Sequence, residues 1–349
     1  MTDRVLAFLR ACLGPVPPGP DDVEAEALAL YHWQVTRSPA YASFAAGRQP
    51  RSLDEIPAVP VALLRDVPFT CFPPSEARYR FETSGTTTGR PGIHRLETAA
   101  AYDLGSAGWF HRRVPGAPAR CLSLVPSPVS APTSSLSHMI GLLFPHARFL
   151  ADGSGCFDPT EAWEALATAR GPVFLATTGL VLAHLLDAPG SADLPEGSLV
   201  LVTGGFKGRS HVEDAVALHA EAGRRLGRAA YVGEYGMTEL SSQGWTDPLP
   251  FAAVDPEGPF HLPPWLVPVA VDPGSGAPLP PGGRGQLRFV DLANVESVLA
   301  LETMDEGTVL PGGSILLHGR LPGAPARGCS LTAEEAAALA RRPSRERGG

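Results

Sequence analysis

Residues 199–239 read LVLVTGGFKGRSHVEDAVALHAEAGRRLGRAAYVGEYGMTE, and this stretch decides the fold. It begins and ends with short apolar runs that are bounded by glycine, a pattern typical of buried strands. Between them Ser210 and Glu213 have the spacing of a helix-capping box. The stretch therefore predicts a strand at 199–203, a helix at 210–226 and a strand at 229–232.

The same alternation of strand and helix runs back to residue 121. It predicts strands at 122–125, 148–151 and 173–176, and helices at 134–144, 159–170 and 179–186. Repeated strand–helix units build a largely parallel sheet that helices cover, so the predicted fold class is α/β. In such sheets ligands bind beyond the carboxyl ends of the strands, where the loops after Thr203 and Val232 lie.

The rest of the chain differs in pattern. Residues 1–78 predict a helical entry region, with its clearest helix at 22–37, and residues 79–250 predict an α/β core. Residues 251–320 predict a smaller β-rich lobe, and residues 321–349 form a short C-terminal segment. The strands expected in this lobe are 266–271, 285–291, 298–302 and 314–318.

Composition excludes several classes of protein. Acidic residues outnumber basic ones 36 to 28, so nucleic acid is not an expected partner. The five cysteines are scattered and form no CxxC pair, which argues against a disulfide framework or a zinc site. These unpaired cysteines suit a reducing cytoplasm, where we expect the protein to be. No membrane span is expected, because no apolar run approaches about 18 residues.

Three loops carry candidate chemistry. The first is a glycine- and hydroxyl-rich segment that could cradle a triphosphate, although such segments are also common as flexible connectors. It lacks the Lys-Ser/Thr of a Walker A loop, so a P-loop ATPase is not predicted. Its residues are Thr83, Ser84, Gly85, Thr86, Thr87, Thr88 and Gly89.

The second loop follows the strand that ends near residue 232 and includes Tyr235, Gly236, Thr238 and Glu239. A ring can stack on a base, a hydroxyl can contact a phosphate and a carboxylate can hold Mg²⁺; a packed Tyr beside a solvated Glu is the alternative. The third loop runs through Gly204, Gly205, Phe206 and Lys207. Lys207 is the only Lys among 28 basic residues, so it is a candidate phosphate ligand or a surface residue in an Arg-rich chain.

These loops, in this order, resemble the adenylate-forming superfamily of acyl-CoA synthetases, peptide-synthetase adenylation domains and luciferases. The resemblance rests on SGTTTG at 84–89, TGG at 203–205, YGMTE at 235–239, and Asp305 followed by Gly319-Arg320. It implies that the first loop holds the phosphates of ATP, Tyr235 stacks on adenine, Thr238 contacts the α-phosphate, Glu239 binds Mg²⁺ and Asp305 grips the ribose. Arg320 then belongs to the same cofactor-binding set. The resemblance also implies that residues 79–250 are the nucleotide-binding core and that the β-rich lobe at 251–320 completes the ATP site.

Two features depart from the superfamily pattern. Gly92 stands where a basic residue usually follows the phosphate loop, and no mobile C-terminal domain with its catalytic Lys is expected after residue 320. A shorter branch is similar in both respects: the LuxE-type acyl-protein synthetases, or long-chain-fatty-acid–protein ligases, of bacterial bioluminescence. The matching stretches are 56–60, 81–87, 134–136, 203–209, 291–294 and 327–331.

This branch resemblance implies activation of a carboxylic acid, with a fatty acid favoured, to acyl-AMP and transfer to a protein thiol. Lys207 is the candidate cation, ATP and Mg²⁺ are the cofactors, and a reductase or carrier protein is the expected acyl acceptor. His94, His138 and His318 are expected to be structural, because the attacking group is already a carboxylate. Two alternatives stay open: activation of an aromatic or other biosynthetic acid with coenzyme A or a carrier protein as acceptor, or a non-catalytic nucleotide-binding scaffold.

Cys329 is the position that fits the acylated cysteine of the branch. Arg327 precedes it, and Thr332 and Glu335 predict a capped helix start just after it, a setting that favours the thiolate; a small buried cysteine is the alternative.

We predict that Cys329→Ser still releases pyrophosphate but carries no thioester. Incubation with ATP, Mg²⁺ and a radiolabelled acid, then a denaturing gel with and without hydroxylamine, measures the label. A hydroxylamine-sensitive label that persists on the serine variant would assign the acceptor to another cysteine.

Overall fold

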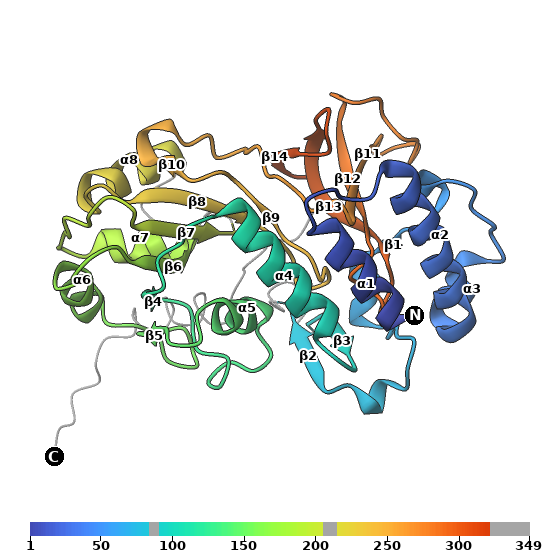
Figure 1. The fold of residues 1–349 in the computed structure, drawn as a ribbon, viewed down its shortest axis with the longest axis horizontal. Coiled ribbons are helices and arrows are strands. Elements are labelled where there is room, and N and C mark those ends of the chain that lie inside the picture. Colours follow the sequence, from blue (N-terminus) through green and yellow to red (C-terminus); the bar gives the residue numbers. More distant parts are fainter. Residues whose placement is uncertain (84–90, 205–214, 322–349) are drawn as a thin grey trace, which may run out of the picture.

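The structure is a computed structural model that describes residues 1–83, 91–204 and 215–321 (Figure 1). Its helices are α1 (Thr2–Cys12), α2 (Pro20–Arg37), α3 (Pro39–Ala45), α4 (Ala100–Arg113), α5 (Ser135–Leu143), α6 (Pro159–Ala167), α7 (Gly179–Asp187) and α8 (Ala215–Arg225). Short strands open and follow the central region: β1 (Val59–Pro60), β2 (Tyr79–Glu82), β3 (Ile93–Leu96), β9 (Gly244–Trp245) and β10 (Leu249–Pro250). The remaining strands are β4 (Cys121–Ser123), β5 (Arg148–Phe149), β6 (Phe174–Thr178), β7 (Leu199–Thr203), β8 (Ala230–Tyr235), β11 (Leu266–Val271), β12 (Arg284–Asp291), β13 (Ala300–Val309) and β14 (Ile315–Arg320).

The larger sheet is the one that the strand–helix alternation predicts. Its order is β10-β8-β7-β6-β4-β5, with β9 also paired to β8. Strands β5, β4, β6, β7 and β8 run parallel to their neighbours, whereas β9 and β10 pair antiparallel with β8. The carboxyl ends of β7 and β8 are therefore adjacent, with Thr203 in register with Glu234.

Two apolar layers cover this sheet because successive strand residues face opposite sides. On β7, Val200 and Val202 pack into the layer formed with α6, α7 and α8. Leu199 and Leu201 pack into the other layer, which includes residues of α1, α2, α4, α5 and the second sheet. The α/β fold class is thus confirmed, with a parallel sheet covered on both faces.

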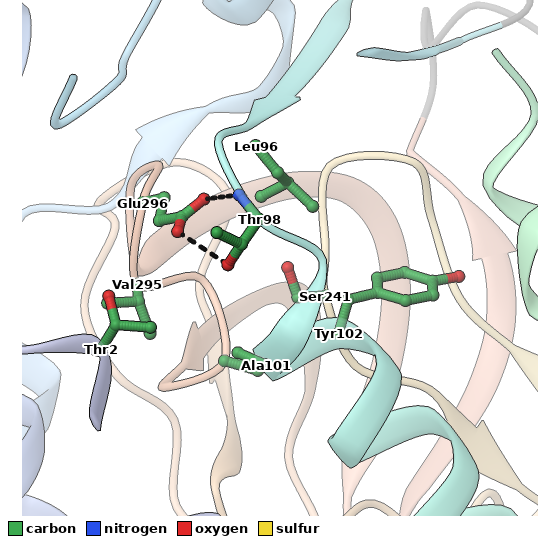
Figure 2. Close-up of a pocket in the computed structure, with 9 residues that line it drawn as sticks. Thr2, Leu96, Thr98, Ala101, Tyr102, Ser241, Val295 and Glu296 are labelled. Carbon is green, nitrogen blue, oxygen red and sulfur yellow. Dashed lines mark hydrogen bonds between the residues drawn. The ribbon is translucent and has the colours of Figure 1, made fainter. Parts of the chain in front are cut away.

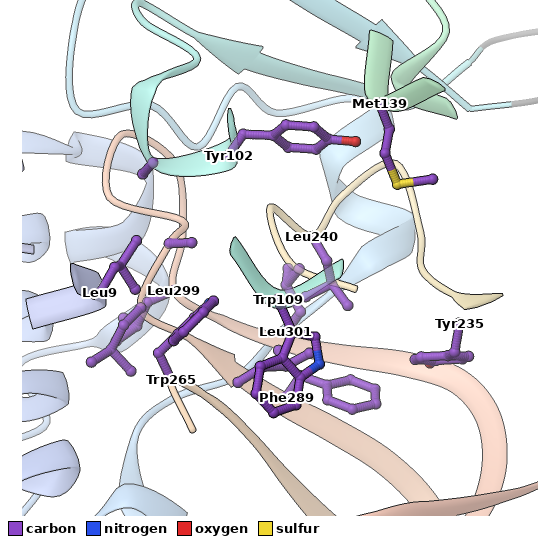
Figure 3. Close-up of a cluster of buried hydrophobic side chains, with 14 of the residues drawn as sticks. Leu9, Tyr102, Trp109, Met139, Tyr235, Leu240, Trp265, Phe289, Leu299 and Leu301 are labelled. Carbon is purple, nitrogen blue, oxygen red and sulfur yellow. The ribbon is translucent and has the colours of Figure 1, made fainter. Parts of the chain in front are cut away.

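The second sheet is antiparallel along β11-β12-β13, with β14 on β13. The entry region supplies its remaining strand, since β1 pairs parallel with β13. Figure 3 shows the large side chains between this sheet and the helices: Phe289 and Leu301 from the strands, Trp109 from α4 and Leu9 from α1. Residues 1–78 are therefore packed into the β-rich lobe.

The hairpin of β2 and β3 forms a separate two-stranded sheet. Its inner face carries Phe81, whose ring contacts those of Tyr102 on α4 and His138 on α5. The hairpin is thereby fixed against the helices beside the parallel sheet (Figure 1). Among the residues described here, no helix combines the length and apolar character needed to cross a membrane.

His94 of β3 predicts a measurable acid sensitivity of the fold. Its Nδ1 has no hydrogen-bond partner among the described residues, and burial lowers its pKa to about 4. The unfolded imidazole takes up a proton near pH 6.5 but the folded one does not, so the free energy of unfolding falls as pH decreases from 6.5 to 4.

We expect His94→Gln to reduce that fall by about 2 to 3 kcal/mol, measured by denaturant unfolding at pH 7 and pH 4. His32→Gln, at an exposed position on α2, is the control. Equal pH dependence in wild type and His94→Gln would contradict the assignment.

Candidate functional site

Thr83 closes the base of the Ser/Thr/Gly loop. It follows β2, and its N–H donates to the Gly92 carbonyl at 2.9 Å, while its Oγ1 accepts from the Gly92 N–H at 2.8 Å. A Cβ at position 92 would lie 3.3 Å from Thr83 Oγ1, closer than ordinary side-chain contacts. Gly92, which departs from the superfamily pattern, therefore allows the two ends of this loop to approach closely.

The ends of β7 and β8 meet through side chains as well as backbone. Thr203 Oγ1 donates a hydrogen bond to the buried carboxylate of Glu234. Gly204 follows with a φ of 69°, in the left-handed region that glycine adopts readily. A Cβ at Gly236 would collide with Glu234 Oε1, so glycine is required for the carboxylate to lie there.

Tyr235 connects the two sheets. Its hydroxyl donates to Asp305 Oδ2 on β13 at 3.0 Å, and both residues are buried. Arg320 Nε on β14 lies 3.6 Å from Asp305 Oδ1, where β14 is in register with β13. The ring of Tyr235 packs against Phe260 and Phe289. Tyr235, Asp305 and Arg320, which come from two separate motifs of the sequence, thus form one contiguous group.

Glu239 lies in the segment that follows Tyr235 and is 7% exposed. Its backbone carbonyl accepts from Asn294 Nδ2 at 2.9 Å. The next residues are fixed by Asp291, whose carboxylate accepts from the Ser241 N–H at 2.9 Å and from Ser242 Oγ at 2.7 Å. Burial raises the pKa of Asp291 to about 6, although these hydrogen bonds lower it.

A pocket lies where the first residues of α1 and α4 meet the turn at 293–296, close to Ser241 (Figure 2). At its edge the Glu296 carboxylate accepts from the backbone N–H groups of Glu97 and Thr98 at 2.7 and 2.9 Å, and from the Thr98 hydroxyl at 3.1 Å. These groups precede α4, so the carboxylate sits at the positive end of that helix.

Thr238 is half-buried, and the other described candidates lie as stated above. The remaining nominated residues lie outside the described part of the chain, and their roles stay predictions. They are Ser84, Gly85, Thr86, Thr87, Thr88, Gly89, Gly205, Phe206, Lys207 and Cys329. Within the described ranges, no group of three or more His, Cys, Asp or Glu side chains could by itself hold a metal ion.

Several residues of this region hold segments of the site in position, and the sequence alone assigns them no such role. Glu234, Asp291, Asn294 and Glu296 are each buried, polar and bonded to residues far away in sequence. Residues 291–294 form one of the stretches that resemble the LuxE-type branch, and that resemblance gives none of them a role. No local spacing indicates these partners, because the bonds span 31 to 199 residues.

His138 and His318 have polar partners in the structure. His138 Nε2 lies 2.7 Å from Asp103 Oδ1, within a group of rings that includes Tyr79 and Tyr102. His318 lies between Thr308 and Glu257. Their expected structural role stays a prediction.

Comparison with known proteins gives a fold and no sequence family. No family model and no curated protein sequence matches the chain. Three similar solved structures are ATP-bound MatB from Rhodopseudomonas palustris, a luciferase-like enzyme from the mealworm Zophobas morio, and O-succinylbenzoate coenzyme A synthetase (MenE) from Bacillus subtilis in complex with AMP. Their TM-scores are 0.51, 0.51 and 0.50, at 18%, 14% and 16% sequence identity.

The matches cover 71%, 73% and 71% of this chain but 49%, 60% and 62% of those structures. The chain thus spans about half the length of MatB and three-fifths of the other two. These neighbours are enzymes of the adenylate-forming superfamily, and at such identities the likeness shows the fold alone. The predicted similarity to the large N-terminal domain of that superfamily is confirmed, and the LuxE-type branch stays a prediction.

The bond between Tyr235 and Asp305 predicts a stability effect. Tyr235→Phe keeps the ring but removes the donor to a buried carboxylate, so the free energy of unfolding should fall by about 1.5 to 3 kcal/mol. Tyr102→Phe is the control, because that hydroxyl donates to the neutral carbonyl of Ser135 at 3.1 Å and should cost about 0.5 to 1.5 kcal/mol. Equal losses in urea unfolding would argue against a charged acceptor at Tyr235.

Proposed function

We propose that this protein uses ATP and Mg²⁺ to activate a carboxylic acid as acyl-AMP and passes the acyl group to a thiol. The observation that carries the proposal is the contact group of Tyr235, Asp305 and Arg320 at the carboxyl end of β8. It joins two motifs of the adenylate-forming resemblance that lie 70 residues apart in sequence. The structural neighbours, one bound to ATP and one to AMP, support the same chemistry.

Several described residues would hold the nucleotide. The paired hydrogen bonds between Thr83 and Gly92 bring together the two residues that flank the Ser/Thr/Gly segment, and a segment rich in glycine and hydroxyl groups would offer backbone N–H groups to a phosphate. Tyr235 would face the adenine, Asp305 the ribose hydroxyls and Thr238 the α-phosphate. Glu239 would supply one carboxylate to Mg²⁺, an ion that is commonly held by one or two carboxylates together with substrate phosphates.

In the first half-reaction the substrate carboxylate attacks the α-phosphorus of ATP, and pyrophosphate leaves. Both reactants are anions, so the bound Mg²⁺ would neutralise part of their charge. The loop at 84–89 would supply backbone N–H groups and hydroxyls, and Lys207 would supply a cation. Glu234 and Thr203 would fix the adjoining strand ends, so that these groups keep one geometry while the two anions approach.

In the second half-reaction the acyl group moves to a thiol. Burial raises the pKa of Cys12 to about 11 and of Cys71 and Cys121 to about 12, which makes these three thiols poor nucleophiles. Cys156 is a further free thiol, and it is half-buried. The branch resemblance, and not elimination, directs the proposal to Cys329 as carrier and to a reductase or carrier protein as the partner. A fatty acid is the proposed substrate.

Coenzyme A as the acceptor of a non-fatty acid is the second candidate. It is favoured by the neighbour MenE, whose name is O-succinylbenzoate coenzyme A synthetase. Acid-dependent pyrophosphate release over a panel of fatty acids of increasing length and aromatic acids, with and without coenzyme A, separates the two. If the protein binds ATP but releases no pyrophosphate with any acid tested, the result would favour the non-catalytic nucleotide-binding scaffold.

Glu239→Gln tests the proposed metal ligand. The variant should keep the fold and lose acid-dependent pyrophosphate release by a factor of 100 or more, corresponding to about 3 kcal/mol of transition-state stabilisation. Glu164→Gln, at an exposed position of α6, is the matched control and should retain activity. Activity of Glu239→Gln within a few-fold of wild type would refute the metal assignment.

A further inference from the structure

Asn294 is the only Asn in this chain of 349 residues. It lies in the turn at 291–298 that connects β12 to β13, and its side chain is fully buried. Its Nδ2 donates to two backbone carbonyls, those of Glu239 at 2.9 Å and Val298 at 3.2 Å. One amide hydrogen of Asn294 thus bonds the turn to the segment of Glu239, and the other bonds to Val298 within the turn itself.

The turn itself is fixed from the opposite side by α2. Gln34 Nε2 donates to the carbonyls of Asn294 and Val295 at 2.7 and 3.1 Å, and its Oε1 accepts from the Leu299 N–H at 3.0 Å. Gln34 is also fully buried. Asn294 is therefore anchored by its backbone while its side chain reaches Glu239.

Two further segments are bonded to the same turn. Asp291 fixes the backbone at Ser241 and the hydroxyl of Ser242, and Ser242 Oγ in turn accepts from Trp265 Nε1 at 2.9 Å. Glu296 fixes the residues between β3 and α4, as Figure 2 shows for Thr98. Because β3 is paired with β2, the turn connects the hairpin that bears the Ser/Thr/Gly loop with the segment that bears Glu239.

We propose that Asn294 is a positioning residue that sets the orientation of Glu239 for Mg²⁺, an inference that rests on the proposed function. The bond to the Glu239 carbonyl fixes the plane of the following peptide, and the direction of the Glu239 side chain depends on the rotation of that backbone. Bonds from Asp291 to residues 241 and 242 restrict the chain after Glu239. Before Glu239, the chain is restricted at Tyr235, the last residue of β8, whose hydroxyl is bonded to Asp305. The carboxylate is therefore presented from a segment that is held on both sides.

Asn294→Asp is the sharpest test. The aspartate side chain has the shape of asparagine, but a carboxylate oxygen replaces the Nδ2 donor and faces the carbonyl oxygens of Glu239 and Val298. Gln286→Glu is the matched control: Gln286 is buried and its Nε2 donates to the Thr303 carbonyl at 2.7 Å, away from Glu239. Both variants should lower the melting temperature. The test is a Mg²⁺ titration of the rise in melting temperature that ATP causes, measured without acid substrate. Only Asn294→Asp should raise the Mg²⁺ concentration that gives half of this rise, by 10-fold or more.

The same variant should raise the Mg²⁺ concentration for half-maximal pyrophosphate release by a similar factor. Asn294→Ala, which removes the donors without adding charge, should raise both midpoints about 3-fold and serves if the aspartate variant does not fold. Mg²⁺ midpoints within 2-fold of wild type in the folded variants, or equal shifts in Gln286→Glu, would overturn the inference. A wild-type protein with neither a thermal response to ATP and Mg²⁺ nor pyrophosphate release would instead refute the proposed function.

Discussion

The hydrogen bond from Tyr235 to Asp305 is the constraint on which the arrangement of the site depends. A carboxylate that is 4% exposed is costly unless polar or charged partners surround it, and here a hydrogen-bond donor and a cation come from two different sheets. Tyr235 approaches from the parallel sheet, and Arg320 from the neighbouring strand of the antiparallel sheet. Moving either sheet would leave buried charge with fewer partners, so the two lobes are held in one relative position.

A second set of buried polar bonds supports the first. The turn at 291–298 accepts or donates bonds to α2, to the start of α4 and to the segment after Tyr235. The entry region also adds β1 to the edge of β13. Residues 1–78 carry no proposed catalytic group, yet Gln34 from this region holds the turn that in turn holds Glu239.

The proposed chemistry suits this design because strand ends are rigid and loops between them can carry reactive groups. β7 and β8 end side by side, and Thr203, the last residue of β7, is bonded to Glu234, the residue before the end of β8. The segments that follow are then directed to one edge of the sheet. In a reaction between two anions, groups that are already fixed avoid the cost of reorganisation during the chemical step.

The local elements and the candidate motifs follow from the amino-acid sequence alone. The periodicity of apolar residues and the Gly and Pro residues that bound an element are local properties of the sequence. The strands at 199–203 and 266–271 are therefore predicted with the bounds that the structure gives. The α/β class follows from the alternation of strands with helices. The predicted strand at 298–302 is longer in the structure, because β13 continues to Val309 through its pairing with β12 and β14. That extension depends on partners and not on local composition.

Which polar residues meet depends on the way that distant segments pack. The sequence nominated Tyr235, Asp305 and Arg320 through a resemblance, but their direct contact depends on how two sheets pack. It gave no role to Asn294, Gln34 or Glu296, whose partners lie 55 to 265 residues away. A buried amide or carboxylate has the same local pattern whether it bonds to its neighbour or to a distant segment, and burial alone makes the distant bond necessary.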